Sequence, residues 1–418
     1  MTQGLDLGDG HRVHLLQGAQ ELFPALIRAM DRASVAIQLE TYIFDVTGSG
    51  AGVAAALVRA AQRGVPTCVL VDGFGTDPLP LDWVVRFQAA GVRYRVYSPL
   101  GPLGLLLPQR WQRLHRKLCV VDRQVLFCGG INVLDDFYDP NYGPLAAPRF
   151  DFAVQTRGRV VGQASDAMET LWQRMQAVSE IRQRHLSDAL RALRAAGAAS
   201  RAARQSSEPR ERRQRSEHQP PQRRRRALLV LRDNVRHRVQ IEKAYLRAIG
   251  MARQEIIIAN AYFLPGRKLR RALVLAAQRG VRVRLLLQGR YEYFMQYHAA
   301  RPVYGALLAA GVEIHEYAPS FLHAKVAVMD AQTPYPWATV GSSNLDPLSL
   351  LLAREANVVI EDARFAQKLR QQLVQAMDNA GQVLDPAGYA LRPLRKRVLD
   401  WLAFGAMRAA LWVAGKSY

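Results

Sequence analysis

The stretch LHRKLCVVD at residues 114–122 is repeated as LHAKVAVMD at residues 322–330, and this repeat indicates how the whole chain is organised. Both copies follow the pattern His-x-Lys-x4-Asp, formed by His115, Lys117, Asp122, His323, Lys325 and Asp330. The alternating apolar run predicts a strand in each copy, on which the His and the Lys point to the same face. A lone His-x-Lys on a strand is most often structural, whereas two copies in the same context indicate one shared site.

A glycine-rich segment that ends in an asparagine follows each copy of the motif. The first reads Gly129-Gly130-Ile131-Asn132 and the second Gly341-Ser342-Ser343-Asn344. We expect Asn132, Asn344 and Ser342 to bind substrate. Because the first copy has Gly130 where the second has Ser342, one half lacks a hydroxyl that could contact phosphate or the histidine, and the halves are not predicted to be fully equivalent.

The duplication extends beyond the motifs, since AAQRGV at residues 60–65 recurs at residues 276–281. We predict helices over 52–63 and 267–279, which end at a glycine, and buried strands over 67–71 and 281–287. Alternating helices and strands favour an α/β sandwich in each half. Two similar halves predict a pseudo-twofold pair with both motifs facing one cleft.

The charge of the chain predicts an anionic partner. The formal net charge is +22 over 418 residues, which suits nucleic acid, a membrane surface or phosphorylated lipid. The three cysteines lie in apolar runs without metal-ligand spacing, so we expect buried free thiols in a reducing compartment. The first residues do not resemble a signal peptide, and no uncharged apolar run reaches the roughly 18 residues that span a bilayer.

We divide the chain into a first domain at residues 1–181, a linker at 182–226, a second domain at 227–390 and a tail at 391–418. The linker contains fourteen arginines, no lysine and four acidic residues, and its composition predicts disorder over most of its length. It either attracts anionic lipid, at about 1 kcal/mol per basic residue near the surface, or is only a solvated connection.

The two motifs contain the groups that phosphodiester chemistry needs. Cations must neutralise the nonbridging oxygens, a nucleophile must attack phosphorus, and an acid must protonate the leaving oxygen on the opposite side. Paired lysines, asparagines and histidines supply this set in duplicate. With one histidine neutral and the other protonated, the first attacks while the second donates its proton, and no cofactor or metal is required.

Duplicated motifs of this kind with a trailing Gly-x-x-Asn resemble the phospholipase D superfamily. The continuation GSSNLDPLSLLLAREANVVI at residues 341–360 is similar to the bacterial cardiolipin synthases, most of all to the B type. The resemblance covers about residues 10–180 and 228–390. It implies two tandem phospholipase D-like α/β sandwich domains, an active site at their interface, His115 as the nucleophile and His323 as the general acid and then base.

The resemblance also implies a carboxylate in the same half that fixes the tautomer of each histidine. Asp151 and Glu355 occupy the corresponding positions, and the alternative for each is a surface ion pair with the preceding arginine. Asp122 and Asp330 complete the motif and belong to the predicted catalytic set. Their position on the strand face opposite to the lysine nevertheless favours capping of the turn into the glycine segment.

Four functions remain open from the residues. The first is a phosphatidyltransferase that joins two phosphatidylglycerols into cardiolipin and releases glycerol, through a phosphatidyl-histidine. The others are a phospholipase D with water as acceptor, a nuclease of the same superfamily, and a basic binding protein without activity. The last does not explain two intact motifs. Phosphatidylethanolamine or other alcohols as substrates, and the oligomeric state, also stay open.

Two segments favour lipid over nucleic acid. A Pro/Gly-framed loop before the first motif holds Leu105, Leu106, Leu107 and Trp111, which suit insertion into a bilayer interface or packing against the other half. The tail predicts an amphipathic helix with Trp401 and Trp412 on its apolar stripe, lying in the membrane interface or capping the second domain. We therefore expect a peripheral protein on the cytoplasmic face of the bacterial inner membrane, with phosphatidylglycerol as substrate.

Overall fold

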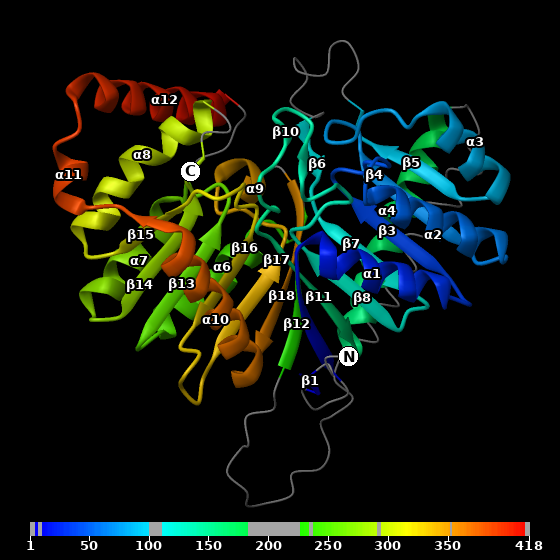
Figure 1. The fold of residues 1–418 in the computed structure, drawn as a ribbon, viewed down its shortest axis with the longest axis horizontal. Helices are drawn as coiled ribbons and strands as arrows, with labels where there is room; N and C mark the ends of the chain where they lie inside the picture. The colour runs from blue at the N-terminus through cyan, green and yellow to red at the C-terminus, as the bar shows by residue number, and fades with distance from the viewer. Residues whose placement is uncertain are drawn as a thin grey trace, which may run out of the picture.

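The computed structural model describes residues 5–6, 11–99, 111–182, 226–233, 237–290, 294–351 and 353–413. Its two halves each surround one mixed β-sheet, and the sheets lie side by side with helices on the outside (Figure 1). This arrangement confirms the predicted pair of α/β domains. Most of the predicted linker, residues 183–225, lies outside the described residues.

The N-terminal sheet has the strand order β1-β2-β11-β8-β7-β3-β4-β5. Its strands are β1 (Leu5–Asp6), β2 (Arg12–Gln17), β3 (Ile37–Thr41), β4 (Thr67–Asp72), β5 (Arg93–Tyr97), β7 (Lys117–Val121), β8 (Val125–Gly129) and β11 (Phe152–Arg157). Its helices are α1 (Gly18–Asp31), α2 (Gly50–Gln62), α3 (Leu81–Ala90) and α4 (Arg159–Arg182). Strands β3, β4 and β5 are parallel, and the remaining pairings are antiparallel.

The C-terminal sheet repeats this plan in the order β12-β18-β17-β16-β13-β14-β15-β19. Its strands are β12 (Arg226–Arg232), β13 (Glu255–Asn260), β14 (Arg282–Gln288), β15 (Glu313–Tyr317), β16 (Lys325–Met329), β17 (Trp337–Gly341), β18 (Ala353–Glu361) and β19 (Gly381–Val383). Its helices are α6 (Gln240–Met251), α7 (Arg267–Gln278), α8 (Phe294–Ala309), α9 (Pro347–Leu351) and α10 (Ala363–Ala380).

The repeated AAQRGV segment folds the same way in both halves. Helices α2 and α7 each end at a glutamine that is followed by an arginine and then a glycine. These glycines, Gly64 and Gly280, adopt φ angles of +85° and +86°. Glycine alone takes this conformation without strain, so it ends the helix and turns the chain into the next parallel strand. The predicted helices and strands at these positions are therefore confirmed.

A single hydrophobic cluster joins the two halves. It contains Leu118 and Val154 from the N-terminal sheet together with Val326 and Val358 from the C-terminal sheet, all nearly inaccessible to solvent. Helices α4 and α10 also contribute to it. Because burial of apolar surface is the main source of stability, this shared core fixes the two sheets, and the motif strands β7 and β16 within them, relative to each other.

The halves differ where the chain leaves the glycine-rich segments. The N-terminal half continues into a small hairpin, β9 (Tyr138–Asp139) and β10 (Gly143–Pro144), whereas the C-terminal half forms helix α9. The tail folds into α11 (Pro386–Ala390) and α12 (Leu394–Val413), and α12 packs against α8 (Figure 1). None of the helices in the described part of the chain is long and apolar enough to cross a membrane.

Candidate active site

Each motif histidine lies on a short segment that crosses to the opposite half of the molecule. The predicted strand begins only at Lys117, because the preceding residues pair with the other sheet: β6 (Arg113–Leu114) runs parallel to β18. The amide N–H of His115 donates to the carbonyl of Arg354 at 3.0 Å. In the same way, the N–H of His323 donates to the carbonyl of Phe150 at 2.9 Å.

This crossing exchanges the carboxylate partners of the two histidines. Nδ1 of His115 lies 2.8 Å from Oε1 of Glu355, and Nδ1 of His323 lies 2.6 Å from Oδ2 of Asp151. Both predicted carboxylates therefore contact a histidine, but the expected pairing within one half is wrong. The alternative of a surface ion pair also fails, since Glu355 and Asp151 are buried. Each Nδ1 is occupied, which leaves each Nε2 for chemistry.

Both histidines line one cavity of about 140 Å³. It lies where the halves meet, so the predicted common cleft is present. Burial lowers the pKa of both imidazoles, and for His323 the ammonium groups of Lys325 and Lys117 lower it further. These shifts favour the neutral imidazole at both positions, and at His115 the carboxylate of Glu355 acts against them.

The motif lysines are buried directly beneath their histidines. Nζ of Lys117 donates to the carbonyl of His115 at 2.8 Å, and Nζ of Lys325 donates to the carbonyl of His323. Burial, followed by repulsion from Lys325, lowers the pKa of Lys117 to about 7. The ring of Tyr42 lies 4.8 Å from the His115 ring and 5.3 Å from Nζ of Lys117. Two buried ammonium groups that repel each other favour the binding of an anion such as phosphate.

Asn132, Asn344 and Ser342 differ in their hydrogen-bond partners. Oδ1 of Asn132 accepts the N–H of Ile43 at 3.1 Å, whereas Oδ1 of the buried Asn344 has no hydrogen-bond partner within the described part of the chain. The hydroxyl of Ser342 donates to Glu355, and its predicted contact with substrate stays a prediction. Ser342 holds the carboxylate that orients His115.

Gly130 occupies the place of Ser342 in the first half, for a steric reason. A Cβ atom at this position would overlap the carboxylate of Asp151. Aspartate is one methylene shorter than glutamate, so its carboxylate lies closer to the backbone of the neighbouring strand. The first copy therefore has glycine instead of serine at this position because the aspartate that contacts His323 leaves no space for a side chain.

Asp122 and Asp330 are structural, and their inclusion in the catalytic set is wrong. The carboxylate of Asp122 accepts the N–H groups of Ser34, Val35 and Ala36 at 2.8–3.2 Å. Asp330 accepts three consecutive N–H groups, from residues 253–255, at 2.8–3.0 Å. Both sit past the far end of the motif strand, where they cap the loop that enters the adjacent strand rather than the turn into the glycine segment.

Two residues that hold the histidine segments were not predicted from the sequence. Oδ2 of Asp72 accepts the N–H of Leu114 at 2.7 Å, and Oε1 of Gln288 accepts the N–H of Leu322 at 3.1 Å. Each is the last residue of an apolar parallel strand, β4 or β14. A polar side chain at the carboxyl end of a buried strand was the available signal.

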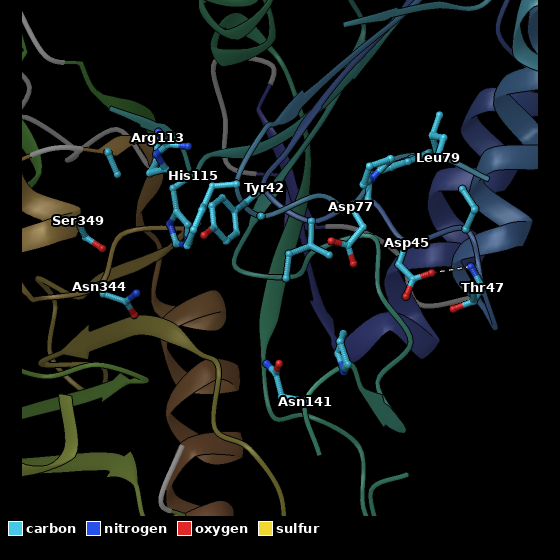
Figure 2. A pocket seen from close by; sticks show the side chains of 18 of the residues that line it. Tyr42, Asp45, Thr47, Asp77, Leu79, Arg113, His115, Asn141, Asn344 and Ser349 are labelled. Atoms are coloured by element: carbon cyan, nitrogen blue, oxygen red, sulfur yellow. Dashed lines mark hydrogen bonds between the residues drawn. The ribbon is translucent and has the colours of Figure 1, made fainter. Parts of the chain in front are cut away.

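A second, larger cavity of about 910 Å³ opens beside His115 (Figure 2). Most of its wall comes from the N-terminal half and is apolar, including Ile43, Phe44, Phe74, Leu79 and Trp111. Figure 2 shows Asn344 and Ser349 on the opposite side, contributed by the C-terminal half. Trp111 lines this cavity, and the predicted membrane contacts Leu105, Leu106 and Leu107 lie outside the described residues.

Comparison with known proteins agrees with this geometry. The family model "Cardiolipin synthase, PLD-like domain" matches residues 26–142 and 245–377, one match in each half. The chain is 40% identical to cardiolipin synthase B of Escherichia coli K12 over 366 residues, which covers 87% of this chain and 80% of that protein. The chain belongs to the cardiolipin synthase family. Its predicted membership of the phospholipase D superfamily is confirmed, and it is a phospholipid phosphatidyltransferase.

Other cardiolipin synthase relatives extend over nearly the whole chain. Cardiolipin synthase B of Salmonella typhi is 37% identical over 407 residues, or 96% of this chain and 88% of that protein. Among solved structures, phosphatidylserine synthase of Haemophilus influenzae is similar with a TM-score of 0.66 at 12% identity, covering 98% and 96% of the two chains. That structural likeness supports the fold alone.

Proposed function

We propose that this cardiolipin synthase joins two phosphatidylglycerols through a phosphatidyl intermediate on His115 and releases one glycerol. The observation that carries the proposal is the exchanged pair of histidine–carboxylate contacts, His115 with Glu355 and His323 with Asp151, in one cavity. Each imidazole is fixed through Nδ1, so both Nε2 atoms are available to a single phosphodiester.

In the first step, Nε2 of His115 attacks phosphorus and the bond from phosphorus to the glycerol oxygen breaks. His323 donates a proton to that oxygen, which leaves as glycerol. The anionic Glu355 stabilises the positive charge that develops on the His115 ring, with the Ser342 hydroxyl holding the carboxylate in place. Proton donation by one positioned group typically contributes about 10²–10⁴ in rate.

In the second step, the now neutral His323 takes the proton from a hydroxyl of the second phosphatidylglycerol. The resulting oxygen attacks phosphorus, and the bond from phosphorus to Nε2 of His115 breaks. Lys117 and Lys325 neutralise the nonbridging oxygens, assisted by Asn132 and Asn344. Because burial and Lys325 lower the pKa of Lys117, an anionic phosphate between the two lysines favours the charged form of both.

The walls of the site and the surface beside it favour a lipid substrate. The larger cavity is lined by aliphatic and aromatic side chains next to His115. On α12, Leu394, Trp401 and Leu402 are 74%, 60% and 66% exposed, and Arg395, Lys396 and Arg397 are exposed beside them. An apolar strip flanked by basic residues suits an anionic bilayer interface. We include peripheral attachment to the cytoplasmic face of the cell membrane in the proposal.

The reaction is tested by incubating the purified protein with phosphatidylglycerol vesicles, alone and with single-stranded DNA. We expect cardiolipin and glycerol in equal amounts, and intact DNA. Phosphatidic acid as the main product would make the protein a hydrolase, and cleaved DNA would make it a nuclease. The His115→Ala variant, purified in parallel, controls for contaminating activity.

Membrane attachment is tested by sedimentation with vesicles of phosphatidylglycerol. The double variant Trp401→Ser, Leu402→Ser should bind at least about 100-fold more weakly than the wild type, because burial that contributes about 1.5–3 kcal/mol is lost for each of the two large apolar side chains. Val85→Ser and Leu81→Ser on α3 change equally exposed apolar residues elsewhere and serve as the control. Equal sedimentation of all three proteins would contradict the role of α12.

A further inference from the structure

We propose that the small cavity beside His323 is a polyol-binding site, in which the β9–β10 hairpin recognises the glycerol headgroup through Asp136 and Asn141. This inference rests on the proposed function and assigns the two alcohol positions of the reaction. The same site would hold the departing glycerol in the first step and the glycerol of the acceptor lipid in the second.

In-line displacement places the alcohol on the side of His323. The leaving oxygen lies opposite the attacking Nε2 of His115 and must reach the proton of His323. Of these two cavities, His323 lines the one of about 140 Å³ but not the one of about 910 Å³, and His115 lines both. The large apolar cavity therefore suits the diacylglycerol part of the phosphatidyl group, and the small one suits a three-carbon polyol.

The wall of the small cavity is polar where the alcohol would lie. Asp136 is buried, and one of its oxygens accepts the N–H of Ala19 at 2.5 Å. Its second oxygen makes no hydrogen bond within the described residues, and the Asn141 side chain makes none either. Burial raises the pKa of Asp136 to about 6. A carboxylate oxygen and an amide can bind two neighbouring hydroxyls, whereas a simple alkanol would leave them unpaired.

The hairpin that carries Asn141, together with Asp136 two residues before its first strand, is fixed against the His323 segment. Arg149 forms an ion pair with Asp139 at 2.6 Å and donates to the carbonyl of Asp135. The ring of Tyr142 packs on Phe321, two residues before His323, at a centroid distance of 5.3 Å. Asn141 is exposed and lines both cavities, and Figure 2 shows its side chain at the wall of the large one. These contacts position Asn141 relative to His323 rather than leaving it on a free loop.

The hairpin belongs to one half only, which limits the active site to one polyol position. Helix α9 occupies the corresponding place in the C-terminal half. A single position agrees with the reaction, because the first glycerol must leave before the second lipid can be deprotonated by the same histidine. In this proposal the difference between the halves, a hairpin in one and helix α9 in the other, determines where the alcohol binds.

The test is a competition between two acceptors in one tube. Wild-type protein, phosphatidylglycerol vesicles and equal concentrations of deuterated glycerol and 1-propanol are incubated, and the two phosphatidyl products are quantified by mass spectrometry. The wild type should prefer glycerol. Asn141→Leu should lower the ratio of glycerol to propanol products about tenfold, equivalent to about 1.4 kcal/mol, and Asp136→Asn should lower it less.

Asp77→Asn provides a matched carboxylate control, because Asp77 lines the large cavity and not the small one. Its product ratio should equal that of the wild type. The inference is overturned if Asn141→Leu and Asp136→Asn both keep the wild-type ratio while transferring to propanol, or if Asp77→Asn lowers the ratio equally. Absence of both phosphatidyl products with the wild type would instead overturn the proposed transfer reaction itself.

Discussion

The two halves carry the same motif but support its histidines with different pairs of residues. The first half supplies Gly130 and Asp151, and the second supplies Ser342 and Glu355. The shorter carboxylate lies against a glycine, and the longer one accepts a hydrogen bond from a serine hydroxyl. Asp151 is therefore accommodated by the missing side chain of Gly130, and Glu355 is held by a hydrogen bond from Ser342. Each carboxylate contacts the histidine of the opposite half.

This difference separates the chemical roles of the histidines. Glu355 receives the hydroxyl of Ser342 and the ring of His115, whereas Asp151 accepts only the N–H of Phe152 besides His323 among the described contacts. Burial raises the pKa of Asp151 to about 7. Each carboxylate accepts one hydrogen bond besides the contact with its histidine, and the donors differ: a side-chain hydroxyl at Glu355 and a backbone N–H at Asp151. With His115 as the proposed nucleophile, the pair of Ser342 and Glu355 lies beside the cationic phosphorylated imidazole.

The largest expected effects separate His115→Ala from His323→Ala with a substrate that carries a p-nitrophenyl leaving group. His323→Ala should release a burst of nitrophenolate equal to the enzyme concentration and then stop, because this leaving group needs no proton. His115→Ala should release none, since the nucleophile is absent. With phosphatidylglycerol, both variants should lose about 10²–10⁴ in rate. Equal bursts from both would break the assignment of roles.

Changing the carboxylates tests whether the partners are exchanged between the halves. Glu355→Gln should slow the nitrophenolate burst, as a defect of His115 would, by about 10–10³. Asp151→Asn should keep the burst and slow transfer to the acceptor, as a defect of His323 would. Pairing within each half predicts the opposite assignment. Circular dichroism of both variants controls for folding.

Exchange of the supporting residues tests the steric link between Gly130 and Asp151. Gly130→Ser should lower the transfer rate at least about tenfold, because its Cβ displaces the Asp151 carboxylate from His323. Adding Asp151→Glu should restore activity by recreating the arrangement of Ser342 with Glu355. Ser342→Gly, which leaves space and removes only one hydrogen bond, should cost less than Gly130→Ser.

A double variant no more active than Gly130→Ser would show that the serine interferes for another reason. Ser342→Gly with activity below that of Gly130→Ser would show that the hydroxyl matters more than the space. Either result would replace the steric account of the asymmetry with a different one.

Much of this organisation followed from the sequence because it depends on local patterns. The repeated motif, the glycines that end α2 and α7 and the apolar runs of β4 and β14 each reflect the chemistry of neighbouring residues. The contact of each carboxylate, Asp151 or Glu355, with the histidine of the other half could not be predicted from the sequence. It depends on backbone pairing of β6 with β18, which are more than 200 residues apart. The role of Ser342 depends on the same pairing.

The smallest effect on catalysis is expected for Asp122→Asn and Asp330→Asn, which compare the capping sites of the two halves. Both should keep wild-type transfer rates and lose about 1–3 kcal/mol of unfolding free energy in urea, since a charged acceptor of several N–H groups is replaced.

Although burial acts to raise it, the N–H groups of Val35, Ser34 and Ala36 hold the pKa of Asp122 below its usual value. The stability that Asp122 contributes is therefore present above its unfolded pKa of 3.8 and is lost as the pH falls through the lower folded value. The difference in unfolding free energy between Asp122→Asn and the wild type should therefore shrink as the pH falls through this range. A large loss of activity in either variant at neutral pH, with the fold intact, would return these aspartates to the catalytic set.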